Sequence, residues 1–104
     1  MIILKNRDVA DHWRINHTGL TGAADHIDLN RTNAAGTGGG TVFPSAPSST
    51  VINVGTDQSM GNSGNDMIAY CFHSVTGYSS FGSYSGTGSN VSVTTGFPVS
   101  LLVS

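Results

Sequence analysis

The spacing of apolar and polar residues along the chain predicts short strands and no long helix. Residues 12–17 alternate between apolar and polar side chains, and residues 25–30 repeat this pattern with Ile27 and Leu29 facing inward. A period of two is typical of a half-buried strand. Similar apolar runs predict further strands at residues 1–5, 51–55, 67–75, 91–95 and 97–103.

Residues 67–75 form the longest and most apolar of these runs. Apolar side chains occupy both faces of the predicted strand, which is typical of a strand at the centre of a sandwich or in a subunit contact. Cys71 lies inside this run and is expected to be a buried thiol, because free cysteine is among the most buried residue types. No intrachain disulfide is possible, since the chain has one cysteine.

Residues 31–50 contain the run GTGGGT and two prolines among serines, and they predict a long loop. Val42 and Phe43 are its large apolar residues, and we expect them to hold the loop on the body of the protein. About seven short strands separated by turns indicate an all-β fold. We therefore expect residues 1–104 to form a single-domain antiparallel β-sandwich with a jelly-roll-like arrangement.

The composition supports this fold class and narrows the partners. The 104 residues include 14 glycines, no glutamate and a single lysine, and 10% are charged, against about 25% in an average domain. A net charge of -2 with four Lys and Arg residues argues against nucleic acid as a partner. No apolar run approaches the ~20 residues of a membrane span, and the N-terminal MIILK is too short for a signal peptide.

A resemblance to a known family is carried by two stretches of the sequence. The run MIAYCFHSV followed by GYSSFGSYSGTGS resembles a motif in a recurrent domain of unassigned function from marine bacteriophage tail and fibre proteins. In that family a TGF-P element follows, as at residues 95–98 here, and then a strand with a basic turn, which MIILKNR resembles. The order is rotated, because the last of these segments opens this chain.

The resemblance implies a non-enzymatic structural protein of a virion, without catalytic residues. Its expected partners are other copies of the chain or other virion subunits, and its expected location is the virion. The chain could also be a piece of a longer fibre protein. Because both apolar ends resemble the same strand region, we expect them to lie side by side, or one to pair with a neighbouring subunit.

Four aromatic residues are the candidates for a ligand or interface site: Trp13, Tyr78, Phe81 and Tyr84. Aromatic rings stack on sugars, so a lectin-like module that binds host or surface glycans is the alternative function. The competing interpretation is that these rings fill the core or a subunit interface.

No cofactor is predicted, and the alternative is a divalent metal. His12, His26 and Asp28 would converge if their strands pair, and imidazole and carboxylate groups suit zinc and similar ions. No HxH or HExxH spacing is present, so an ordinary polar surface is the favoured interpretation of these residues.

Overall fold

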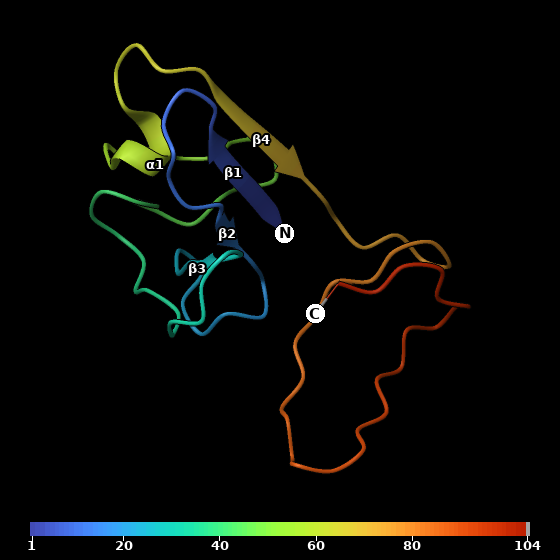
Figure 1. Cartoon of the computed structure of the whole chain (residues 1–104). Coiled ribbons are helices and arrows are strands. Elements are labelled where there is room, and N and C mark those ends of the chain that lie inside the picture. The colour runs from blue at the N-terminus through green and yellow to red at the C-terminus, as the bar shows by residue number, and fades with distance from the viewer. Residues whose placement is uncertain (104) are drawn as a thin grey trace.

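A computed structural model describes residues 1–103, and its regular structure is almost entirely β. The chain forms one antiparallel sheet in the order β3-β2-β1-β4 (Figure 1). The elements are β1 (Ile2–Asn6), β2 (Arg14–Asn16), β3 (Ile27–Asp28), α1 (Gln58–Gly61) and β4 (Met67–Cys71). The all-β class predicted from the sequence is confirmed. The described residues 1–103 form one sheet, and no second sheet packs against it as the predicted sandwich would require. None of their helices has the length and apolar character needed to cross a membrane.

The strand register gives the sheet two different faces. Ile3 lies opposite Ile15 on one side and Tyr70 on the other, and Ile15 lies opposite Ile27. These four residues therefore form one apolar row across all four strands. Its exposure differs along the row, from 5% at Ile15 to 42% at Tyr70.

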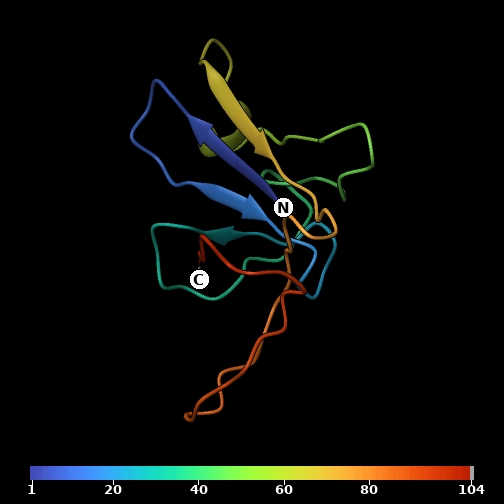
Figure 2. The ribbon, with the colours of Figure 1, turned by 90° about the vertical axis from the view of Figure 1, so that its right-hand side faces the viewer.

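The opposite face of the sheet carries the core. Leu4 packs there with Phe43 and Met60, and all three are at most 3% exposed. Figure 2 shows α1 behind the sheet, where it brings Met60 against β1. The helix is a single turn, and Asp57 caps its N-terminus by accepting a hydrogen bond from the Ser59 backbone N–H.

Residues 31–50 contain neither a helix nor a strand, and Phe43 holds them on the body as predicted. The main chain beside Phe43 bonds to residues 55 and 57, with Gly55 N–H donating to the Val42 carbonyl at 2.8 Å. A Cβ atom at Gly55 would overlap the carbonyl oxygen of Thr41. The predicted strand at 51–55 is wrong, because these residues bond to a loop and not to the sheet.

Two predictions of burial are also wrong. Leu29 is 53% exposed, because β3 ends at Asp28 and the side chain has no sheet neighbour to cover it. Strand β4 lies at an edge of the sheet and not at its centre, and Cys71 is exposed. The local sequence of β4 is apolar on both faces, but only β1 pairs with it among the described residues.

The segment after β4, residues 72–103, forms a long loop that leaves the sheet, and its C-terminal end turns back toward it in both views (Figures 1 and 2). Its local order comes from a tight turn in which Val75 and Ser79 bond, and from Phe81, whose ring centroid lies 5.8 Å from that of Phe72. The predicted strands at 91–95 and 97–103 do not form within the described chain. Since each strand needs a partner, these apolar residues stay exposed.

Candidate functional site

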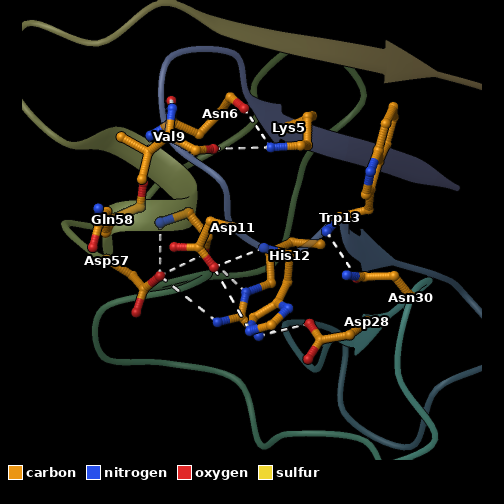
Figure 3. Close-up of polar contacts among 12 residues, drawn as sticks. Lys5, Asn6, Val9, Asp11, His12, Trp13, Asp28, Asn30, Asp57 and Gln58 are labelled. Carbon is orange, nitrogen blue, oxygen red and sulfur yellow. Dashed lines mark hydrogen bonds and ion pairs between the residues drawn. The ribbon is translucent and has the colours of Figure 1, made fainter.

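Arg14 on β2 is the centre of a polar network between the sheet and α1. Its Nη1 donates to Asp28 Oδ1 at 2.6 Å, its Nε donates to Ser59 Oγ at 2.8 Å, and its Nη2 lies 3.7 Å from Asp57 Oδ1. The side chains of Arg14 and Asp28 are 14% and 1% exposed. Figure 3 shows Asp28 and Asp57 on opposite sides of this network. Because buried charges need close partners, the network ties β2, β3 and α1 together.

Asp57 links the network to the start of α1. Its Oδ1 accepts hydrogen bonds from the Ser59 backbone N–H, at 2.9 Å, and from the Ser59 hydroxyl. Burial raises the pKa of Asp57, but the Ser59 hydrogen bonds and the Arg14 charge outweigh it and hold the pKa below its ordinary value. A carboxylate with a lowered pKa is a weak base, which favours a structural role for the contact between Asp57 and Ser59. We assign this network a structural role.

Asn6, at the end of β1, is fully buried, and its side chain makes three hydrogen bonds. Figure 3 shows Asn6 near Val9 and Gln58. Its Nδ2 donates to the Gln58 carbonyl at 2.7 Å, and its Oδ1 accepts from the N–H groups of Asp8 at 3.0 Å and Val9 at 3.2 Å. These bonds fix the turn after β1 against α1. The helix side of the sheet is therefore covered by hydrogen-bonded polar side chains and a small apolar core, although Asp28 Oδ2 is buried there without a hydrogen-bond partner among the described residues.

The outer edge of β4 is open. Met1 and Phe72 exchange two main-chain bonds of 2.9 Å, and Arg7 N–H donates to the Asp66 carbonyl at 2.9 Å. Hydrogen-bonded positions alternate along an antiparallel pair, so the main-chain groups of Ile68 and Tyr70 also face β1. Those of residues 67, 69 and 71 face the other way, where no strand of the described chain pairs with them.

Apolar and aromatic side chains are exposed beside this edge and beyond it. Within β4 and at its end, Tyr70 and Phe72 are 42% and 44% exposed. Residues 72–103 add further exposed side chains: Val75, Tyr78, Tyr84, Val91, Val93, Val99, Leu101, Leu102 and Val103. An open groove of about 730 Å³ lies at the end of the edge, between Phe72 and the loop around Pro47. Exposed apolar groups in this number indicate an interaction surface.

Comparison with known protein families matches residues 1–103 to the family described as "Domain of unknown function (DUF7483)". The chain belongs to this family. Searches of curated proteins and of solved structures gave no match. The match covers the sheet, α1 and the extended segment after β4, so the open edge and the exposed segment belong to the same DUF7483 domain.

The structure separates the four predicted aromatic site residues of the DUF7483 domain. Trp13 lies just before β2 and is 36% exposed, whereas the other three lie in the segment after β4. Tyr78 and Tyr84 are 81% and 61% exposed, so they do not fill the core of this chain. Phe81 is half-buried and its ring lies against that of Phe72. Phe72 was not among the predicted site residues.

The three candidate metal ligands of the DUF7483 domain also have other neighbours. Asp28 is paired with Arg14, and His12 Nε2 lies 3.8 Å from Asp11 Oδ1. Burial lowers the pKa of His26, and the nearby charge of Arg14 lowers it further against the opposing effect of the carboxylates, chiefly Asp28. Within residues 1–103, no three His, Cys, Asp or Glu side chains come together in a group that could hold a metal ion.

Sequence reasoning missed Arg14 and the open edge of β4. Arg14 alternates with Trp13 and Ile15, which places it on the polar side of a strand, but its partners come from β3 and from α1. One signal for the edge was available in the sequence. Residues 67–72 are uncharged and apolar on both faces, and they precede a segment rich in glycine, which suits a strand that meets a partner from outside the sheet.

Proposed function

We propose that this DUF7483 domain is a non-enzymatic assembly domain of a phage or phage-like particle, which associates with copies of itself or with other virion subunits. The observation that carries the proposal is the open edge of β4, continued by an extended segment with exposed apolar side chains. Only 10% of the residues are charged and the net charge is -2, so electrostatic repulsion between copies is small. The resemblance to tail and fibre proteins supports the same proposal.

The β-sandwich predicted from the sequence belongs to this proposal. A single described chain forms one sheet, and its segments 91–95 and 97–103 have strand-like patterns without strand partners. In an assembly these segments would add strands to neighbouring copies. A layered β architecture would then be a property of the particle component and not of the isolated chain.

Size-exclusion chromatography with light scattering tests the assembly function. We expect the full chain to have a mass above the 10.7 kDa of one copy, and this mass to rise with protein concentration. A protein that stays at the mass of one copy across the accessible concentrations would contradict the proposal. High salt should weaken the association little, because the surface is apolar and carries few charges.

A second candidate function is the binding of surface glycans, favoured by the exposure of Tyr78 and Tyr84. Both rings are free to stack on a sugar, and neither contributes to the core. A glycan array with the wild-type chain and with Tyr78→Ala and Tyr84→Ala tests this function. Binding that both variants lose, with an unchanged circular dichroism spectrum, would favour it. Binding that survives both substitutions would rule out these rings as the platform.

A further inference from the structure

We infer that residues 91–95 of one copy add as a strand to the outer edge of β4 of the next copy. This inference rests on the proposed assembly function and names the two surfaces that meet. The acceptor is the edge with the outward main-chain groups of residues 67, 69 and 71. The donor is the segment with Val91 and Val93 at alternate positions.

The two edges of the sheet differ in their protection. Strand β3 is two residues long, and next to it His26 and Gly36 exchange main-chain bonds of 3.1 and 2.8 Å, which cover that edge. Strand β4 is five residues long, and its sequence MIAYC has no charge and no proline. Edge strands that must avoid other chains normally carry lysine, proline or a bulge. The β4 edge therefore has the character of an acceptor.

The donor segment fits this edge in length and pattern. Residues 91–95 match the five residues of β4, and their sequence VSVTT consists of residues with a high preference for strands apart from one serine. Val91 and Val93 are 42% and 57% exposed, so one face of the segment has no cover in a single copy. Gly88 and Gly96 bracket the segment with φ of +75° and +82°, which lets the chain turn at both ends.

A second copy is the occupant that the geometry favours. Figures 1 and 2 show that the segment after β4 loops away from the sheet of its own chain before its C-terminal end turns back. Each chain has one donor and one acceptor, and these are different surfaces. Such a contact is head-to-tail, so it generates an open filament or a closed ring, of which the smallest is a dimer with reciprocally exchanged strands. Both outcomes suit a repeated component of a particle.

Disulfide trapping tests the juxtaposition with the full chain. Cys71 is exposed at the end of the acceptor strand and is the only cysteine. In the five-residue register Val91→Cys places a second thiol opposite it when the strands pair antiparallel, and Thr95→Cys does so when they pair parallel. Under mild oxidation we expect a ladder of dimers, trimers and longer species on non-reducing gels. The wild type has one thiol per chain, so its disulfide-linked species cannot exceed a dimer. The matched control is Val54→Cys, at a valine that is 49% exposed. A linked monomer, or a ladder that is equal in the control, would overturn the inference.

Proline substitution tests the main-chain pairing without engineered thiols. Val93→Pro removes a donor-segment N–H at a position outside every ladder of the single copy, so the fold should persist. We expect self-association to weaken by about tenfold, the equivalent of one lost hydrogen bond with its steric clash, and Ser85→Pro to leave it unchanged. If Val93→Pro associates as tightly as the wild type, the inference fails while the assembly function stands. A monomeric wild type would remove both.

Discussion

The substitution Arg14→Met should destabilise the domain more than any other change to a charged residue near the sheet. Methionine keeps much of the length and apolar stem of the side chain but removes the guanidinium. Asp28, with a side chain 1% exposed, then loses its hydrogen bond of 2.6 Å and the cation that compensates its charge. Ser59 loses one donor but keeps its bond to Asp57.

The expected loss follows mainly from Asp28. Breaking a buried ion pair by removing one partner costs about 3–5 kcal/mol, because an uncompensated charge remains in the interior. Asp57 adds little, since its side chain is 31% exposed and water can replace the guanidinium. A domain of this size has a free energy of unfolding of about 5–15 kcal/mol, so Arg14→Met should remove a large share of it.

Urea unfolding followed by the fluorescence of Trp13, the only tryptophan, measures this loss. The matched control is Arg7→Met, because Arg7 lies 3.9 Å from Asp66 with side chains that are 62% and 78% exposed. An exposed pair of this kind contributes about 0–1 kcal/mol. Adding Asp28→Asn to Arg14→Met should restore part of the stability by removing the buried charge. The reasoning fails if Arg14→Met loses no more stability than Arg7→Met, or if the second substitution restores nothing.

Three further changes have expected outcomes. Phe43→Ala should cost about 3–5 kcal/mol in thermal unfolding and speed proteolysis of the loop 31–50, since Phe43 is fully buried; unchanged cleavage would contradict its anchoring role. Gly55→Ala should lower the melting temperature because a Cβ there overlaps the Thr41 carbonyl, whereas Gly82→Ala, with open space around it, should not. Because the pKa of His26 is lowered from 6.5 in the folded state, the unfolded chain binds the proton first, and stability should fall as pH drops below about 6.5. Urea midpoints measured across that window should fall less steeply in His26→Gln, and an unchanged slope would refute this.

The sequence predicts the parts of this fold that depend on local pattern. Alternation at residues 12–17 and 25–30 locates β2 and β3, although the strands are shorter than the patterns. Phe43 is predicted to hold its loop because it is one of two large apolar residues in a polar stretch, and it is fully buried. In both cases a few neighbouring residues carry the necessary information.

Features that depend on distant partners are not predictable in this way. Helix α1 is four residues long, too short for any helical period, and it forms because Asp57 caps it and Met60 reaches the core. The contact between Arg14 and Asp28 follows from the register of β2 and β3, which no single segment determines. The position of β4 at an edge depends equally on which other segments pair with it.

The error about β4 is itself informative. The sequence predicts a central strand because residues 67–75 are apolar on both faces, and it predicts additional strands after residue 90. The described chain shows neither feature, because one edge of β4 is open and residues 91–95 have no partner strand. Strand addition between copies would supply both at once, by giving β4 a neighbour on each side and the donor segment a sheet. The open edge of β4 and the unpaired strand-like pattern of residues 91–95 would then both follow from one head-to-tail contact.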